Sequence, residues 1–295
     1  MSSGFRGVAR RTAGVVSLFA GMGLAARSFA ETIGQPTDGA IDLQGAASEI
    51  RAHEIAFHNH ILLPIIVFIS LLVAVLLLVV IVRFNKRANP TPARWSHNTP
   101  VEVAWTVLPV LILMFIAIFS FKLLLEEHNM PKPYMTVKVT GRQWNWDYEY
   151  PDQKIPAATS TLMSESDAAA RHVPYQLAAN APMVAPVNKV VRVQVTAEDV
   201  IHSFSVPAFG IKVDAIPGKL NETWFKADRT GVFYGQCSQL CGSNHSFMPI
   251  EVRVVSQPEF DAWVASKAPK AKPILVAAAA TTPAGPVPPA PVAGR

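Results

Sequence analysis

The segment Gly235-Gln-Cys-Ser-Gln-Leu-Cys-Gly-Ser-Asn-His-Ser-Phe-Met-Pro249 holds both cysteines of the chain and decides what kind of domain it belongs to. Its candidate metal ligands are Cys237, Cys241, His245 and Met248. A further histidine, His202, lies upstream beside a strand-like stretch. Two thiolates, two imidazoles and a thioether form a soft ligand set, which favours copper over hard, oxygen-seeking ions. The segment therefore predicts a copper site.

Several kinds of site are compatible with two cysteines at this spacing. A mononuclear electron-transfer copper site uses one Cys, two His and a weak axial Met, so this chain has one thiolate more than that site needs. A second, bridging sulfur would let two copper ions share the cluster. The alternatives are a Cys237–Cys241 disulfide in an oxidising compartment and a four-coordinate zinc site, which would leave Met248 without a role. The closely spaced His and Met favour two coppers.

The sequence around this segment has the period-two alternation of half-buried strands. The clearest alternation is in residues 135–140, 190–196 and 250–255. This pattern predicts an antiparallel sandwich or barrel with Greek-key connections over residues 128–268. Residues 152–186 are rich in Ala, Ser and Pro with weak periodicity, so we expect an irregular insertion there.

The end of this region is marked by a helix and a change of composition. Ser256-Gln-Pro-Glu259 is a capping box with proline at the first helical position, which predicts a short helix. Residues 269–295 are dominated by Ala and Pro and cannot bury a core, so we expect a disordered tail.

Two apolar runs precede the strands and predict a membrane hairpin over residues 61–127. The runs, with helices expected at about 61–83 and 103–124, are close to the ~20 residues that span a bilayer. The basic residues between them are Arg83, Lys86, Arg87 and Arg94. By the positive-inside rule this short loop is cytoplasmic, so residues 31–60 and the strand region lie on the outer side.

Residues 1–30 have the features of a cleaved signal peptide. Three arginines precede an apolar stretch at 13–26, and Ser28-Phe-Ala30 offers a small-x-small cleavage site. The alternative, an uncleaved anchor, is weaker because the apolar stretch is too short to span.

Composition and charge exclude several classes of protein. Half of the 295 residues are hydrophobic and 16% are charged, which excludes a disordered or fibrous chain and argues against a cytosolic enzyme. The net charge of +5 arises from the arginines of residues 1–30 and the basic loop, whereas residues 128–267 carry equal numbers of acidic and basic side chains. We therefore expect no nucleic-acid partner.

Together these motifs, from about His97 to Trp263, resemble the cytochrome c oxidase subunit II family, which carries the binuclear copper centre CuA. The resemblance implies a two-helix transmembrane hairpin plus an all-β cupredoxin-like Greek-key barrel. It also implies that Cys237 and Cys241 bridge two copper ions. The remaining ligands that it implies are His202 and Met248 on one copper, and His245 and the backbone carbonyl of Gln239 on the other.

The position between the cysteines departs from the family. The family usually has Glu there, and its side chain holds a magnesium ion at the junction with subunit I. A carbonyl ligand does not depend on the side chain, so the resemblance still implies copper binding. Gln239 is neutral and a poorer ligand for a hard cation, so the sequence leaves the magnesium site open.

Three residues resemble family positions that accept electrons or dock the donor, and a fourth adjoins them. Trp144 matches the first tryptophan of the family's Gln-Trp-x-Trp motif, which accepts the electron from cytochrome c. Glu149 and Asp214 match acidic docking positions, and Asp147 adjoins them; each would otherwise be an ordinary surface charge. The aromatic residues that follow Trp144 alternate along a strand, and we expect them to pack in the barrel.

Glu102 has two compatible interpretations. Thr99-Pro-Val-Glu102 is a capping box at the start of the second apolar run. In the segment 97–105, Glu102 also matches the family glutamate at the mouth of the K proton pathway into subunit I.

The resemblance thus implies an electron-transfer subunit of a proton-pumping terminal oxidase in a bacterial inner membrane. It would take electrons from cytochrome c and pass them to haem in subunit I, with subunit III a further partner; oxygen is reduced in subunit I. Non-redox subunits of quinol oxidases lack the copper ligands that are intact here. Copper delivery would predict a flexible Met/His-rich loop, and nitrous oxide reductase a second catalytic domain.

Overall fold

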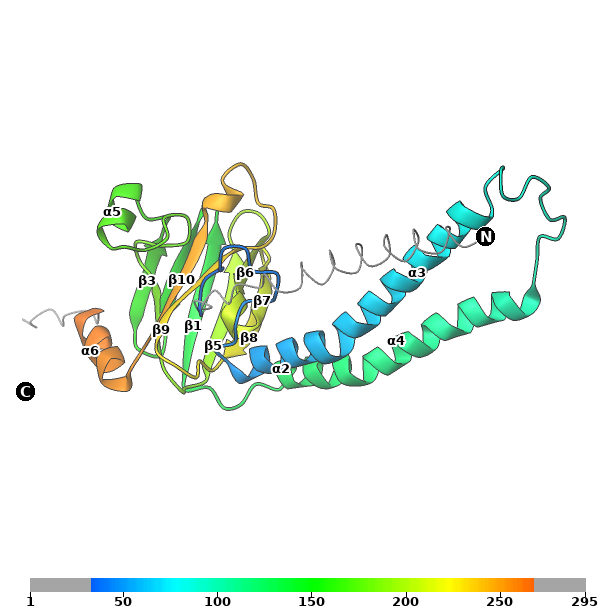
Figure 1. Cartoon of the computed structure of the whole chain (residues 1–295). Helices are drawn as coiled ribbons and strands as arrows, with labels where there is room; N and C mark the ends of the chain where they lie inside the picture. The colour runs from blue at the N-terminus through cyan, green and yellow to red at the C-terminus, as the bar shows by residue number, and fades with distance from the viewer. Residues whose placement is uncertain (1–32, 268–295) are drawn as a thin grey trace, which may run out of the picture.

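The computed structural model describes residues 33–267, so the expected signal peptide and Ala/Pro tail lie outside the described residues. Two long helices extend from one side of a β domain, as Figure 1 shows. The N-terminal part of the described chain, 33–48, runs along the β domain before the first helix, and Ala47 donates its N–H to the carbonyl of Ala208 at 2.8 Å. Trp224 of the β domain also donates its indole N–H to the carbonyl of Glu127, near the end of the second long helix, at 2.8 Å, so the helices and the β domain are joined by contacts as well as by the chain.

The first membrane helix is longer than the sequence predicted. It comprises α2 (Glu49–Phe57), a π-helical turn η1 (His58–Leu62) and α3 (Leu63–Arg83), which form one continuous run of 35 residues. Helix formation continues through the polar residues 49–60, which the sequence placed in an outer segment, because they pack on the end of α4 and on the β domain. His53 of α2, for example, contacts Glu126 of α4 at 2.8 Å.

The second membrane helix, α4 (Thr99–His128), has 30 residues and is also suited to cross a membrane. Its N-cap is Asn98, one residue earlier than the capping box predicted, and the Asn98 side chain accepts from the N–H of Val101 at 3.3 Å. The side chain of Glu102 accepts from the N–H of Asn98 at 3.2 Å, so the reciprocal pair of hydrogen bonds is still present. The lipid-facing side chains of both helices are exposed here, as apolar membrane helices require.

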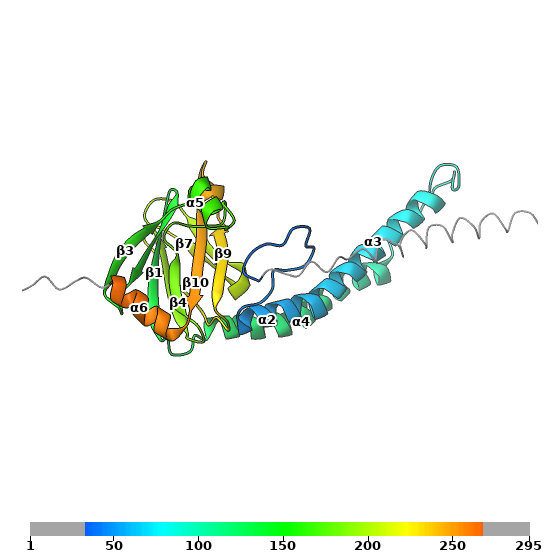
Figure 2. The same cartoon turned by 60° about the vertical axis from the view of Figure 1, so that its left-hand side comes forward.

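The β domain consists of two five-stranded sheets packed face to face (Figures 1 and 2). The first sheet has the order β3 (Ile155–Ser160), β2 (Asn145–Tyr150), β1 (Met135–Arg142), β5 (Val191–Ala197), β8 (Asn221–Phe225). The second has the order β4 (Met183–Pro186), β10 (Pro249–Val255), β9 (Gly231–Cys237), β6 (His202–Val206), β7 (Ile211–Ala215). Their inner faces form one apolar core, to which the alternating residues of β1 and β5 contribute valines that are fully buried.

The sheets are mixed, which corrects the expected all-antiparallel arrangement. β1 pairs with β5 in parallel, with Val137 opposite Val193, and β4 pairs with β10 in parallel. The other neighbours are antiparallel. Alternation in a sequence reports which side chains face the core, but it carries no information on the direction of the neighbouring strand.

The segment 152–186 contains regular structure that the sequence did not predict: β3, a short helix α5 (Glu165–Ala170) and β4. Neither strand alternates. β3 is an edge strand whose four central residues are exposed, whereas all four residues of β4 are buried. This segment is held to the domain by Glu251 of β10, which is fully buried and accepts from the N–H of Ala179 at 2.8 Å.

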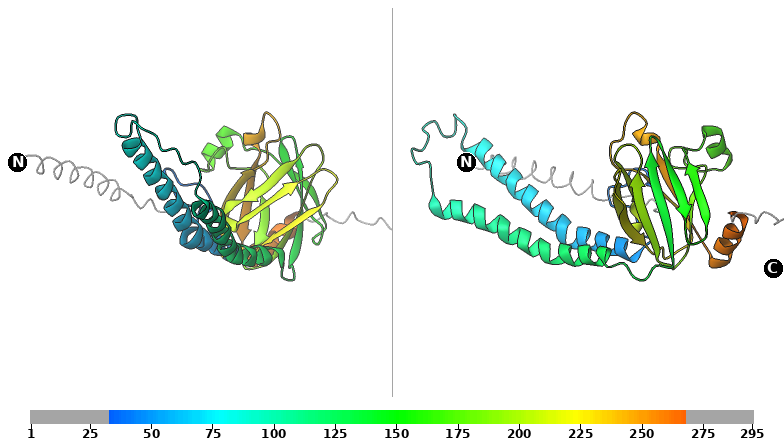
Figure 3. Two further views of the ribbon diagram at one scale, coloured as in Figure 1. Left: turned by 90° about the vertical axis from the view of Figure 1, so that its right-hand side faces the viewer. Right: turned by 180° about the vertical axis from the view of Figure 1, so that it is seen from behind.

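The last described element is the helix α6 (Gln257–Lys267), which begins at the predicted capping box. The N–H and hydroxyl of Ser256 both donate to Glu259, at 2.9 and 2.7 Å. α6 lies on the side of the barrel away from the membrane hairpin in each of the views of Figures 1, 2 and 3.

Candidate metal centre

The predicted metal ligands come from two places in the second sheet. His202 is the first residue of β6 and Cys237 is the last residue of β9. These strands are paired, with Phe204 opposite Cys237, so the imidazole and the first thiol lie at the same end of the sheet. The loop that follows β9 carries Cys241 and a 3-10 turn η3 (His245–Phe247), and returns to β10.

The ligand atoms converge at the end of the barrel. The Sγ atoms of Cys237 and Cys241 are 3.8 Å apart, and the Cys237 Sγ is 3.9 Å from Nδ1 of His202. His202 and the two cysteines place all three ligand atoms within 4.8 Å of one another. His245 joins them, with its Nδ1 3.5 Å from the Cys241 Sγ, and the Cys237 thiol donates to the carbonyl of Gln239 at 3.4 Å.

The centre is shielded from solvent. His202 is fully buried, Cys237, Cys241 and Met248 are each no more than 5% exposed, and His245 is half-buried. Met248 follows η3, and its carbonyl accepts from the N–H of Cys237 at 3.3 Å, which fixes the methionine backbone beside the first thiol. The side chain of Gln239, in contrast, is exposed.

Both cysteines are free thiols, and their separation is well beyond the ~2.05 Å of a disulfide bond. Burial and the nearby Cys237 thiol raise the pKa of Cys241 to about 12. At neutral pH the metal-free Cys241 thiol therefore holds its proton, and a cation that binds to its sulfur must displace that proton. Two facing sulfurs, two inward-facing imidazole nitrogens, a backbone carbonyl and a buried thioether make a donor set that suits soft copper ions. This geometry fits a copper pair better than a four-coordinate zinc site.

Asp199 orients one imidazole, although the sequence reasoning did not single it out. Its Oδ1 lies 2.9 Å from Nε2 of His202, which leaves Nδ1 facing the sulfurs. Desolvation opposes ionisation of Asp199. Hydrogen bonds from His202 and from the N–H groups of Val200 and Gln143 nevertheless lower its pKa, so the carboxylate is charged. A carboxylate behind a ligating histidine fixes the ring orientation and raises its basicity. The signal in the sequence was the spacing Asp-x-x-His.

Replacing Asp199 by asparagine is expected to weaken copper binding by about 10- to 100-fold. Asparagine keeps the size but loses the charge that holds His202. Competition titration of the full chain with a copper chelator measures the effect. Glu198→Gln removes the neighbouring carboxylate, which pairs with Arg142 instead, and serves as the matched control. Equal copper affinities of the wild type and the Asp199→Asn variant would show that Asp199 has no positioning role.

Gln143 connects the predicted electron-entry residue to the metal loop. Its side-chain Nε2 donates to the carbonyl of Cys241 at 2.8 Å, and its backbone N–H donates to Asp199 at 2.7 Å. Trp144 follows it in the turn between β1 and β2, half-buried, and its indole packs over Gly242. Gly242 has a φ of 127° and faces this ring so closely that an added Cβ would lie 3.0 Å from it. Trp144 thus contacts the residue next to a thiol ligand.

The aromatic residues after Trp144 pack in the core, as expected. Trp146, Tyr148 and Tyr150 are at most 3% exposed. Trp146 contacts the His202 ring edge-on, with centroids 5.9 Å apart. Gly141 lies against the same two rings, where a Cβ would come within 3.0 Å of each, so the absence of a side chain lets the imidazole sit against β1.

The three acids suggested for docking have different environments. Asp214 is exposed on β7, and Glu149 is partly exposed on β2, where it pairs with Lys138 at 3.6 Å. Asp147 is buried, with its carboxylate 3.2 Å from Arg142 and accepting from Thr159 at 2.7 Å. Its carboxylate is therefore paired inside the fold, with Arg142 shared between Asp147 and Glu198, so Asp147 presents little surface to a docking partner. Glu102 lies at the other end of the chain's long axis, at the start of α4.

The fold and the site define a membrane-anchored cupredoxin-like domain with a buried cluster of two cysteines and a histidine that could hold a metal ion. Residues 135–255 match the family described as "Cytochrome C oxidase subunit II, periplasmic domain", and residues 36–123 match its transmembrane domain. The chain belongs to the cytochrome c oxidase subunit II family, whose members are subunits of haem–copper oxidases.

Known relatives agree with this membership. Cytochrome c oxidase subunit 2 of Cereibacter sphaeroides is 43% identical over 250 residues, covering 79% of this chain and 82% of that protein. A probable cytochrome c oxidase subunit 2 of Rickettsia conorii is 46% identical over 233 residues, covering 79% and 73%. The crystal structure of the periplasmic domain of subunit II of the Bradyrhizobium japonicum oxidase is 53% identical and covers 47% of this chain and 96% of that domain, with a TM-score of 0.43.

Proposed function

We propose that this chain is the electron-transfer subunit of its oxidase. In this proposal it accepts electrons from cytochrome c at a binuclear copper centre on the periplasmic side of a bacterial inner membrane. It passes them to haem in subunit I, where dioxygen is reduced to water with proton pumping. The observation that carries the proposal is the convergence of His202, Cys237, Cys241 and His245 at one buried end of the barrel. When bound there, a copper pair would supply a one-electron carrier with little geometric change.

The protein's part in this function is to hold the ligands rigidly and to exclude water from them. Cys237, His202 and Met248 are held at the ends of paired strands, and the loop carrying Cys241 is tied to the first sheet through Gln143. Such a preformed site keeps its ligands in place whether or not an electron is present, which favours rapid transfer.

Trp144 is proposed as the residue through which electrons enter. It is the half-buried aromatic that contacts the metal loop from the surface, and exposed tryptophans are frequent anchors at protein interfaces. The segments that carry the candidate metal ligands offer further exposed apolar side chains, among them Ile201, Leu240 and Phe247. A donor protein that docks here would exclude water from the indole.

The docking acids are proposed to be Glu149 and Asp214, because a cytochrome c with a lysine-rich haem edge would be attracted to carboxylates at low salt. In the assembled oxidase, we expect the second-order rate of reduction by cytochrome c to fall as ionic strength rises. We expect cytochrome c to reduce the double variant Glu149→Gln/Asp214→Asn about tenfold more slowly than the wild type at low salt. The rate for this variant should also depend less on ionic strength. Stopped-flow kinetics measures both, and the charge-matched control is the double variant Glu165→Gln/Asp261→Asn, at two exposed positions on α5 and α6. If the double variant kept the wild-type dependence on ionic strength, Glu149 and Asp214 would not belong to the docking surface.

Glu102 is proposed as a proton-entry residue on the cytoplasmic side, and its capping role can be separated from this one. Glu102→Gln keeps an oxygen that can accept from Asn98 but cannot ionise, so the helix should persist while oxidase turnover falls severalfold. Asn98→Ala removes the cap instead, at a cost of about 1 kcal/mol, and should leave turnover unchanged. The measurement is oxygen consumption by the assembled enzyme. Unchanged turnover in Glu102→Gln would reduce Glu102 to a helix cap.

A further inference from the structure

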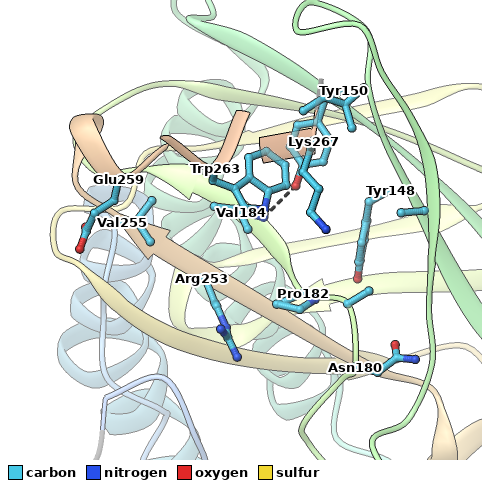
Figure 4. Close-up of a pocket in the computed structure, with 13 residues that line it drawn as sticks. Tyr148, Tyr150, Asn180, Pro182, Val184, Arg253, Val255, Glu259, Trp263 and Lys267 are labelled. Carbon is cyan, nitrogen blue, oxygen red and sulfur yellow. Dashed lines mark hydrogen bonds between the residues drawn. The ribbon is translucent and has the colours of Figure 1, made fainter. Parts of the chain in front are cut away.

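A cavity unrelated to the metal centre lies between the insertion, β10 and α6 (Figure 4). Its volume is about 420 Å³, within the range of small-molecule sites in proteins. β10 leads from the metal loop at Pro249 to α6 after Val255, so the cavity is at the far end of the barrel from the copper ligands. The segment that the sequence left without a role, residues 152–186, forms one side through Asn180 and Pro182.

One wall of the cavity is apolar and aromatic. Tyr150 of β2 and Trp263 of α6 meet edge to face, with ring centroids 4.8 Å apart. The hydroxyl of Tyr150 accepts from the N–H of Val184 at 2.7 Å, as the dashed line in Figure 4 shows, so this ring is held in place. Ile155 and Val255 complete the wall. A flat apolar body would bury its surface here.

The cavity is also lined by two cationic side chains, Lys267 and Arg253, whose hydrogen-bond donors are not all used. The Lys267 side chain, on α6, makes no ion pair or hydrogen bond within residues 33–267. Arg253 of β10 uses its Nε on Glu251, at 2.9 Å, and its two terminal nitrogens have no partner in the described part of the chain. Both side chains reach toward the cavity in Figure 4. The carboxylate that lines the cavity, Glu259, is already engaged by Ser256.

Tyr148 also lines the cavity, but its hydroxyl is enclosed by the fold beside Ser160 and is not available to a ligand. The views in Figures 2 and 3 place α6 on the side away from the membrane hairpin, so the cavity is reached from water and not from lipid.

We propose that this cavity binds a water-soluble organic anion, a carboxylate carried on a flat aromatic body. The carboxylate would accept hydrogen bonds from the terminal nitrogens of Arg253 and from Lys267, and the body would pack on Tyr150 and Trp263. A charged hydrogen bond of this kind gives selectivity for the anion over a neutral molecule of the same shape. Neither the proposed electron path nor the copper ligands take part.

Equilibrium dialysis of the full chain in lipid nanodiscs, with empty nanodiscs as the partition control, tests the proposal. The probes are 2-naphthoate and its neutral analogue 2-naphthamide. We expect saturable, one-to-one binding of naphthoate and at least about tenfold weaker binding of the amide. Lys267→Gln should weaken naphthoate binding by about tenfold, whereas Lys226→Gln, an exposed lysine elsewhere, should not change it.

Arg253→Gln serves as a second variant, with the near-ultraviolet circular dichroism spectrum as the check that Glu251 still holds the insertion. It should also weaken naphthoate binding. The proposal is overturned by any of three results: no saturable binding of naphthoate, equal affinity for naphthoate and the amide, or equal naphthoate affinity in the wild type and the Lys267→Gln variant.

Discussion

Replacing Cys237 by serine is expected to abolish the two-copper site and leave at most one weakly bound copper ion per chain. The Sγ of Cys237 is the atom closest to the rest of the set, since it lies 3.8 Å from the Cys241 Sγ, 3.9 Å from His202 Nδ1 and 3.4 Å from the Gln239 carbonyl oxygen. A serine hydroxyl is a hard, neutral donor and cannot replace a bridging thiolate.

The fold should survive this change because serine is nearly isosteric with cysteine and has hydrogen-bond partners at the site. Copper content and the visible spectrum of the purified chain report the effect. Ser238→Ala, at the adjacent exposed position, is the matched control and should keep both copper ions. If Cys237→Ser retained two copper ions with an unchanged spectrum, the bridging role assigned to this sulfur would be wrong.

Replacing Trp144 by phenylalanine is expected to slow reduction by cytochrome c by more than about tenfold while leaving the metal centre intact. The indole packs over Gly242, next to Cys241, and belongs to the turn whose Gln143 also binds the Cys241 carbonyl. Phenylalanine would keep part of this packing but would shrink the ring that faces a docking partner.

Two comparisons separate loss of electron entry from damage to the centre. Reduction by a small soluble reductant should proceed at the same rate in Trp144→Phe and in the wild type, because it does not need the docking surface. Trp263→Phe alters a half-buried tryptophan on α6, at the other end of the barrel, and should leave both rates unchanged. A Trp144→Phe variant reduced by cytochrome c at the wild-type rate would exclude the proposed entry point.

Much of this arrangement could be predicted from the sequence because it depends on local patterns. The two apolar runs gave the membrane hairpin, and the valines of β1 and β5 alternate and are buried as expected. The cluster Cys237–Met248 forms locally, since its ligands are separated by single turns of one loop. Only His202 had to be brought from another strand, and its pairing with β9 brings it there.

What could not be predicted depends on contacts between distant parts of the chain. β1 and β10 each have a parallel neighbour, but the alternation of their residues would be the same with an antiparallel one. The sequence predicts a surface charge at Asp147, but in the structure its carboxylate is buried against Arg142 and Thr159. The insertion looked irregular because its strands are respectively too exposed and too buried to alternate. Asp199 gains its role from the position of the His202 ring, which a sequence motif suggests but does not fix.

The most direct test of the central claim is the copper content of the full chain, measured together with its electron paramagnetic resonance spectrum after copper is added under reducing and then mildly oxidising conditions. The proposed centre predicts two copper ions per chain that share one unpaired electron, seen as a hyperfine pattern from two equivalent nuclei. A single copper ion with a one-nucleus pattern, or a metal-free chain with Cys237 and Cys241 oxidised to a disulfide that resists reconstitution after reduction, would contradict it.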